Sequence, residues 1–180
     1  SMSRLPLALP SHICETLCMI EDFLSSHGIT FTRYEHPAVF TCEESGKLPS
    51  MPGTPTKNLF LHDARSGAYA LVVVGHDDLV DLKSVRSALG WSKLSFGSSE
   101  KLREFLGVDP GSVTVLGLMH DVTHSVSLYV DEPIARAESI QCHPLVNTAT
   151  LVLTADAFRR FLEATGHEVH VLTVAKKTGM

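Results

Sequence analysis

Lys57 is the residue whose type and position carry the clearest chemical signal in this sequence. It follows a turn-rich segment and begins an apolar run, in Gly53-Thr54-Pro55-Thr56-Lys57-Asn58-Leu59-Phe60-Leu61. Lysine is rarely buried without a partner, so a lysine that enters a strand can reach into a cleft and stabilise an anion or a developing oxyanion. A lysine that extends from a strand end into water explains the same run equally well.

Two other patterns resemble catalytic machinery, but their geometry argues against it. His120-Asp121-Val122-Thr123-His124 resembles a two-histidine zinc motif, which requires a helix and a glutamate, whereas β-type residues follow here. We expect a loop at this place, and neither a metal nor a cofactor. Cys142 and His143 are neighbours in a β-type run, so their side chains point to opposite faces and cannot pair as thiol and base. Any hydrolysis is therefore expected to proceed without a covalent intermediate.

Composition predicts one globular domain in a reducing compartment. The 180 residues are 44% hydrophobic and 19% charged, and Ser1 precedes a methionine in the place of an initiator, so we expect the domain over residues 2–180. No apolar run approaches the roughly 18 residues that span a bilayer. The irregular spacing of the cysteines favours free thiols and a cytoplasmic location, with Cys14 and Cys18 packed in the core; they are Cys14, Cys18, Cys42 and Cys142.

The net charge of −5 argues against broad coating of nucleic acid, which draws on many lysine and arginine contacts to phosphate. A small basic face remains compatible with the sequence. It would come from one stretch that also holds Asp81, Glu100 and Glu104, and its members are Lys83, Arg86, Lys93, Lys101 and Arg103. A solvated surface of mixed charge is the alternative.

Helix and strand signals alternate along the chain. Periodicity and capping residues predict helices at 11–27, at 98–106 and at 154–165, and another that begins after Asp77 or Asp78 and ends at Gly90. A capping box formed by Thr41 and Glu44 predicts a further short helix. Strands are predicted at 29–34, 57–61, 68–74, 93–96, 112–118, 125–130, 139–143, 149–153 and 167–174, with hairpins joining 57–61 to 68–74 and 112–118 to 125–130. These elements predict a mixed α/β domain with helices packed on a largely antiparallel sheet.

Four segments together resemble the YbaK and prolyl-tRNA synthetase-associated domain family. They are Gly-Thr-Pro-Thr-Lys57-Asn58-Leu-Phe-Leu, then Lys93-Leu-Ser-Phe-Gly, then Leu-Gly107-Val-Asp-Pro110-Gly111-Ser112-Val113-Thr114, then His143-Pro144-Leu-Val-Asn147. The likeness covers nearly the whole chain and is greatest to the free-standing ProX or PrdX branch. The resemblance implies a trans-editing hydrolase that deacylates mischarged tRNA(Pro), with Ala-tRNA(Pro) the expected substrate and prolyl-tRNA synthetase a possible partner.

The resemblance also implies roles for individual residues. Lys57 would lie over the terminal adenosine and its ester and stabilise negative charge, with Asn58 beside it as a hydrogen-bonding partner. The backbone of Gly111, Ser112 and Val113 would line the site, and His143 and Phe40 would form pocket walls. From the residues alone, Asn58 and Gly111 also suit ordinary turns, and His143 suits a strand histidine that is satisfied within the fold.

Two positions depart from the family pattern. Val115 stands where the Gly-x-x-x-Pro loop has proline, and His62 stands where relatives are expected to carry a second lysine. Two alternatives in function also remain open. One is deacylation of another mischarged tRNA such as Cys-tRNA(Pro), and the other is a non-catalytic module that binds tRNA or a synthetase.

Overall fold

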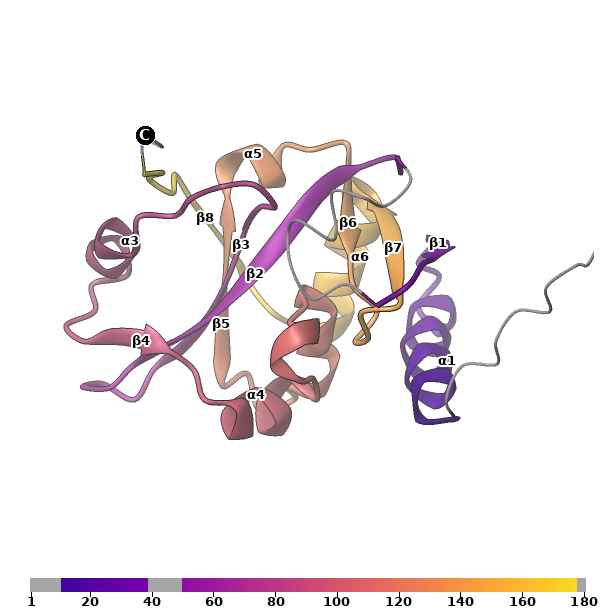
Figure 1. Cartoon of the computed structure of the whole chain (residues 1–180), viewed down its shortest axis with the longest axis horizontal. Helices are drawn as coiled ribbons and strands as arrows, with labels where there is room; N and C mark the ends of the chain where they lie inside the picture. The colour runs from indigo at the N-terminus through magenta and orange to yellow at the C-terminus, as the bar shows by residue number, and fades with distance from the viewer. Residues whose placement is uncertain (1–10, 39–49, 178–180) are drawn as a thin grey trace, which may run out of the picture.

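The computed structural model describes residues 11–38 and 50–177. Figure 1 shows a twisted sheet flanked by helices, with α1 and β1 at one end of the molecule and α3 and β4 at the other. Among the described residues, no helix is long and apolar enough to cross a membrane. Phe40 and the predicted helix at Thr41 and Glu44 lie outside the described residues.

The described residues form five α-helices, two 3-10 helices and eight strands. The helices are α1 (Ser11–Ser26), α3 (Leu82–Leu89), α4 (Ser99–Leu106), η1 (Pro110–Ser112), η2 (Val115–His120), α5 (Glu132–Ala135) and α6 (Ala155–Thr165). The strands are β1 (Thr32–Glu35), β2 (Thr54–Asp63), β3 (Tyr69–Gly75), β4 (Leu94–Phe96), β5 (Val126–Asp131), β6 (Ser139–Cys142), β7 (Ala149–Thr154) and β8 (Val169–Leu172).

The sheet has the strand order β1-β7-β6-β2-β3-β5-β8, and β4 also pairs with β2. Four pairings are antiparallel, namely β1 with β7, β6 with β7, β2 with β3 and β2 with β4. Three are parallel, namely β2 with β6, β3 with β5 and β5 with β8. The prediction of a mixed α/β fold with a mostly antiparallel sheet is therefore confirmed, as is the hairpin between β2 and β3.

Alternating side chains of β3 divide the core into two layers. Leu71 and Val73 join the larger layer, to which α1, α4, η2 and α6 contribute buried residues. Val72 and Val74 face the smaller layer, which is closed by α3 and by the C-terminal segment around Val174. The central strand is thus covered on both faces, which explains its continuous apolar run.

Capping residues set several helix boundaries as predicted. Ser98 accepts a hydrogen bond from the Lys101 amide at the start of α4, and Thr154 accepts one from the Ala157 amide at the start of α6. The expected cap of α3 at Asp77 or Asp78 is wrong, because Asp81 is the capping residue. The Asp78 carboxylate instead accepts the Gly75 amide at 3.0 Å and closes the turn that follows β3.

The predicted strand at 112–118 and its hairpin with 125–130 are also wrong. This segment forms η1 and η2, and β5 pairs in parallel with β3 and β8. A short apolar run does not distinguish a strand from a buried helical turn. Here η2 packs so closely on α4 that a Cβ on Gly117 would lie 2.8 Å from the Leu106 carbonyl oxygen. The expectation for Cys18 fails too, because its side chain is exposed on α1.

Candidate functional site

Strand β2 changes partners along its length, which leaves part of one edge unpaired. Its first residues, Thr54 and Pro55, pair with β6, whereas residues 61–63 pair with β4. β3 occupies the other edge from Thr56 to His62. Between the β6 and β4 pairings, no strand in the described part of the chain pairs with this edge. Main-chain groups there can therefore meet a ligand.

Asn58 presents its main-chain N–H and C=O groups to this unpaired edge. The Phe60 carbonyl accepts a hydrogen bond from the Gly97 amide at 2.9 Å on that side of the strand. The Pro55 carbonyl, on the opposite side, accepts from the His76 amide at 3.1 Å. Because main-chain groups alternate in direction along a strand, Asn58 shares the direction of Phe60. Its N–H can donate to a developing oxyanion.

A cavity of about 270 Å³ adjoins the same edge. A Cβ on Gly97 would lie 2.3 Å from a ring carbon of Phe60, so glycine lets the chain after β4 run this close to β2. The cavity therefore has walls from β2, from the start of α4 and from η1. They are formed by Asn58, Leu59, Phe60, Phe96, Gly97, Ser99, Leu102, Pro110 and Val113.

Lys57 points to the face of β2 that also carries Leu59 and Leu61, next to the smaller core layer. It is the fourth residue of β2 and not the first, as the sequence had suggested. The side chain is partly buried, and its Nζ donates to the main-chain carbonyl of Asp78. That carbonyl is neutral and an ammonium has three donors, so Lys57 keeps its charge and two further N–H groups.

Polar side chains gather where β6, β7 and β1 lie side by side. Continued by one pair, the register of β6 with β7 places His143 opposite Thr150. His36 Nε2 lies 2.8 Å from Thr150 Oγ1. His36 and His76 both act electrostatically on His143. We call these imidazole and hydroxyl groups, His143, His36, His76 and Thr150, the polar row.

His143 is neutral at pH 7. Burial lowers its pKa below the ordinary value of 6.5, and His36 and His76 lower it further, although a hydrogen bond with the Ala149 carbonyl raises it. Nδ1 lies 3.4 Å from that carbonyl. The tautomer that donates from Nδ1 leaves Nε2 as an acceptor. The neighbouring Cys142 thiol is buried, which raises its pKa to about 12 and makes it a poor nucleophile.

The prediction that Asn58 hydrogen-bonds to Lys57 is wrong. Adjacent residues of a strand point to opposite faces, and Asn58 Nδ2 instead lies 3.5 Å from the Val113 carbonyl. Its Oδ1 is buried and has no hydrogen-bond partner among the described residues. Lys57 therefore extends from one face of β2 to the turn that follows β3, whereas Asn58 borders the unpaired edge with its main chain.

The predicted loop at residues 111–113 lies on the Asn58 side. Val113 contacts the Asn58 amide and lines the cavity at the edge of β2. Ser112 lines a separate hollow of about 460 Å³ together with Asn147, and Gly111 is exposed. The structure therefore joins Asn58 to Val113 at the unpaired edge and groups His143 with His36 and His76. The predicted contact at Phe40 lies outside the described residues.

The two departures from the family pattern lie away from the polar row. Val115 is buried in the larger core layer. The His62 ring stacks on Tyr69, with centroids 4.4 Å apart and planes 16° apart. A phosphate contact by His62 would therefore have to come from a ring already engaged with an aromatic neighbour.

Sequence analysis missed Asp78, Thr150, His36 and His76 as members of the site. The ten histidines of the chain show no ligand spacing, so their types alone give no reason to group any of them. His76 and Asp78 directly follow a buried central strand, where functional groups are common, and this was the available signal. His36 and Thr150 are brought together only by the pairing of β1 with β7.

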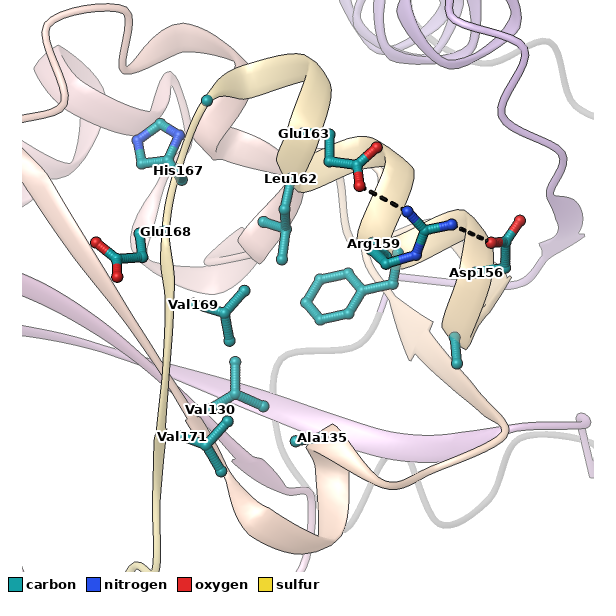
Figure 2. A pocket seen from close by; sticks show the side chains of 13 residues that line it. Val130, Ala135, Asp156, Arg159, Leu162, Glu163, His167, Glu168, Val169 and Val171 are labelled. Carbon is teal, nitrogen blue, oxygen red and sulfur yellow. Dashed lines mark hydrogen bonds and ion pairs between the residues drawn. The ribbon is translucent and has the colours of Figure 1, made fainter.

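A larger cavity, of about 750 Å³, lies between α6, α5 and β8, away from these residues. Figure 2 shows its apolar floor, with Val130, Val169 and Val171 beneath Leu162. At the rim, Arg159 is paired with both Asp156 and Glu163, at 2.5 and 2.6 Å. The cavity offers little free polar chemistry, and we do not assign the reaction to it.

Comparisons with known proteins show the family to which this chain belongs. Residues 36–161 match the family model of an aminoacyl-tRNA editing domain. The prolyl-tRNA editing protein ProX of Acetoanaerobium sticklandii is 34% identical over 140 residues, which are 77% of this chain and 85% of that protein. The prolyl-tRNA synthetase associated domain-containing protein 1 of Danio rerio is 37% identical over 157 residues, 86% of this chain and 85% of that protein.

A solved structure supports the fold. The crystal structure of a candidate trans-editing enzyme for prolyl tRNA synthetase covers 95% of this chain and 100% of its own, with a TM-score of 0.69 and 21% identity. At this identity the likeness concerns the arrangement of the chain and not the chemistry.

Proposed function

The chain belongs to the aminoacyl-tRNA editing domain family and is an aminoacyl-tRNA deacylase, and from this premise we propose that it clears mischarged tRNA(Pro), with Ala-tRNA(Pro) as its main substrate. One observation carries the proposal. The Lys57 ammonium is held by a neutral carbonyl at a strand edge and forms no ion pair within the described residues. Its charge is therefore available to a substrate oxygen.

The reaction is water attack on the ester that joins the amino acid to the terminal ribose. The water oxygen bonds to the ester carbon and gives up its protons, and the bond from that carbon to the ribose oxygen breaks. The ribose oxygen takes up one of these protons and leaves as a hydroxyl, and the amino acid leaves as a carboxylate. Negative charge develops on the former carbonyl oxygen. Lys57 and the main-chain N–H of Asn58 are the proposed donors to it, and a single donor of this kind is worth roughly 3–4 kcal/mol.

His143 is proposed to orient groups and not to act as a strong base. Because its pKa is lowered by burial, it is neutral at pH 7 and its Nε2 accepts a hydrogen bond without carrying charge. Water or a ribose hydroxyl are the donors that suit it. No positive charge on His143 then competes with Lys57 for the developing oxyanion.

A separate hydrolase is needed because a synthetase cannot distinguish similar amino acids well enough by binding alone. A site built for proline excludes the smaller alanine weakly, because each missing methylene is worth only about 1–3 kcal/mol. The cavity beside Asn58, of about 270 Å³, has room for a small group only and is lined mainly by apolar side chains. We propose that it receives the amino-acid side chain. We further propose that prolyl-tRNA synthetase, which makes the mischarged tRNA, is a partner, as the names of the relatives suggest.

A hydrolysis panel tests the function. Ala-, Cys- and Pro-tRNA(Pro) are incubated with wild type, with Lys57→Ala and with Lys101→Ala, a partly exposed lysine paired with Glu104 at 2.8 Å. We expect Ala-tRNA(Pro) to be cleaved fastest, Lys57→Ala to lose about 10²- to 10³-fold in rate, and Lys101→Ala to match wild type.

Each other outcome of the panel has a distinct meaning. If all three substrates survive with the protein as long as they do in buffer alone, the proposed hydrolase activity is rejected. Binding of tRNA without cleavage would then indicate a binding module. Faster cleavage of Cys-tRNA(Pro) would change the substrate but not the reaction. A folded Lys57→Ala with full activity would remove the role of Lys57 while leaving the function in place.

A further inference from the structure

We propose that Lys176, near the C-terminus, is a positioning residue that keeps the Lys57 ammonium free for substrate. The two lysines do not contact each other. They are linked through the turn at residues 75–81, which joins β3 to α3 and contains Asp78. The inference rests on the proposed function only for what the charge of Lys57 does.

In this turn, the main-chain carbonyl and the side-chain carboxylate of Asp78 accept hydrogen bonds from different partners. The main-chain carbonyl accepts from Lys57 Nζ. The carboxylate accepts from the Gly75 amide at 3.0 Å, and the Asp78 amide donates back to the Gly75 carbonyl at 3.1 Å. A Cβ on Gly75 would lie 2.7 Å from this carboxylate, so a larger residue there would displace the Asp78 side chain from its present position.

Lys176 lies on the carboxylate side of Asp78. Its Nζ is 3.7 Å from Asp78 Oδ2 and 2.5 Å from Asp131 Oδ2, and it also donates to the Val174 carbonyl at 2.8 Å. The Asp131 side chain is only 2% exposed, and its other oxygen accepts the Val174 amide at 2.9 Å. A buried carboxylate with these partners holds the ammonium firmly, because leaving it unpaired is strongly unfavourable.

The backbone of the C-terminal segment reinforces the same arrangement. Val80 and Lys176 form an antiparallel bridge. The Asp81 amide donates to the Ala175 carbonyl at 2.9 Å, and the Lys177 amide donates to the Leu79 carbonyl at 2.7 Å. Residues 174–177 therefore hold the second half of the turn, while β2 and β3 hold the first.

The physical consequence concerns which oxygen of Asp78 faces Lys57. A carboxylate is a stronger partner for an ammonium than a neutral carbonyl is. With Lys176 on its far side, the carboxylate stays on the Gly75 amide and Lys57 meets only the carbonyl. Without the Lys176 charge, the carboxylate can turn and form an ion pair with Lys57, which would neutralise the charge that the substrate needs.

Lys176→Met is the variant that tests this, with Lys177→Met as the matched control. Both remove one lysine charge from the same segment, but Lys177 forms no ion pair within the described residues. We expect Lys176→Met to lower kcat for Ala-tRNA(Pro) about 10-fold or more with a smaller change in KM, since misplaced catalytic groups mainly lower the rate of the chemical step. Lys176→Arg should recover most of the rate, and Lys177→Met should stay close to wild type.

A second substitution separates positioning from simple stabilisation. In the Lys176→Met background, Asp78→Asn removes the charge that could capture Lys57 but keeps an oxygen for the Gly75 amide. The double variant is therefore expected to be faster than Lys176→Met alone. A loss that merely reflects a weakened fold would deepen or stay unchanged when a second residue of the turn is replaced.

Acetylation by acetic anhydride, followed by mass spectrometry, measures whether the Lys57 ammonium is free or paired, and it requires no tRNA. Lys57 should react more slowly in Lys176→Met, where it is paired, and recover in the double variant. Unchanged Lys57 reactivity and unchanged kcat in a folded Lys176→Met would overturn the inference. If wild type cleaves no aminoacyl-tRNA at all, the proposed function fails, while the acetylation result still decides the link between Lys176 and Lys57.

Discussion

At the scale of single residues, the proposed site combines an ammonium that is anchored by a neutral group with an imidazole that is kept uncharged. Lys57 is anchored by a carbonyl, and His143 is kept uncharged by burial and by two neighbouring imidazoles. The sequence singled out Lys57 by its type and position, whereas a role for His143 was implied only by the family resemblance. It could not identify Asp78, whose role is a main-chain carbonyl and would be open to any residue.

His143→Gln is expected to flatten the dependence of stability on pH. The folded pKa of His143 lies below its ordinary 6.5, so the unfolded state binds the proton more tightly. Wild-type stability is therefore full above the ordinary pKa and falls as the pH drops below it, with a slope of at most about 1.4 kcal/mol per pH unit for one proton. Urea unfolding at several pH values from about 7 to about 5 measures the slope.

His120→Gln is the reference variant for this measurement. Burial also lowers the pKa of His120, although no other charged group contributes there. Each substitution should remove its own part of the slope. A His143→Gln protein whose stability falls with acid as steeply as wild type would show that His143 is not buried in its neutral form.

At the scale of elements, a buried hydrogen bond between the Asp121 carboxylate and His167 fixes how η2 meets the end of the sheet. The Asp121 carboxylate accepts the Ser125 and Val126 amides at 2.9 Å each, and its Oδ2 lies 2.9 Å from His167 Nε2. Burial by itself raises the pKa of Asp121, but the hydrogen bonds from His167 and the two amides outweigh it and lower the pKa overall. Sequence analysis noticed this segment only for its resemblance to a zinc motif.

Asp121→Ala is expected to lower the free energy of unfolding by about 3–5 kcal/mol, because it leaves buried donors without an acceptor. The control is Asp109→Ala, which removes an exposed carboxylate paired with Arg103 at 2.7 Å. An exposed pair of this kind is worth about 0–1 kcal/mol. Urea unfolding of both variants gives the comparison, and equal losses would contradict the structural role given to Asp121.

At the scale of the whole molecule, positive charge is unevenly neutralised. The basic residues of α4 and α6 lie in ion pairs, including Arg103 with Asp109 and Arg160 with Asp156. Lys83 and Arg86 on α3 form no ion pair within the described residues. α3 lies at one end of the molecule beside β4 and the C-terminal segment (Figure 1). Lys83 and Arg86 belong to the small basic face described in the sequence analysis, and they can offer their charge to the phosphates of a tRNA.

Lys83→Ala combined with Arg86→Ala is expected to raise KM for Ala-tRNA(Pro) and leave kcat nearly unchanged. Each lost phosphate contact should reduce the slope of log KM against log salt by about 1. Arg159→Ala with Arg160→Ala is the matched control, since it removes the same charge from a helix where both arginines are paired. Equal salt slopes in the two double variants would place the tRNA elsewhere.

The sequence by itself determined the secondary-structure types over most of the chain, the hairpin of β2 and β3 and the mixed sheet. These depend on local periodicity, on capping residues and on side-chain type, which are written in short segments. Only the tertiary structure decided that residues 112–118 are 3-10 turns, because their packing on α4 overrides a run that also suits a strand.

The tertiary structure also decided how the site residues group. Lys57 and Asn58 are adjacent in sequence, yet the strand sends their side chains to opposite faces, and the partners on each face come from distant segments. His143 follows β6 and meets the Ala149 carbonyl of β7, Val113 reaches Asn58 after η1, and Lys176 faces the Asp78 carboxylate. Such contacts depend on strand register and on main-chain carbonyls, neither of which has a signature in residue type or spacing.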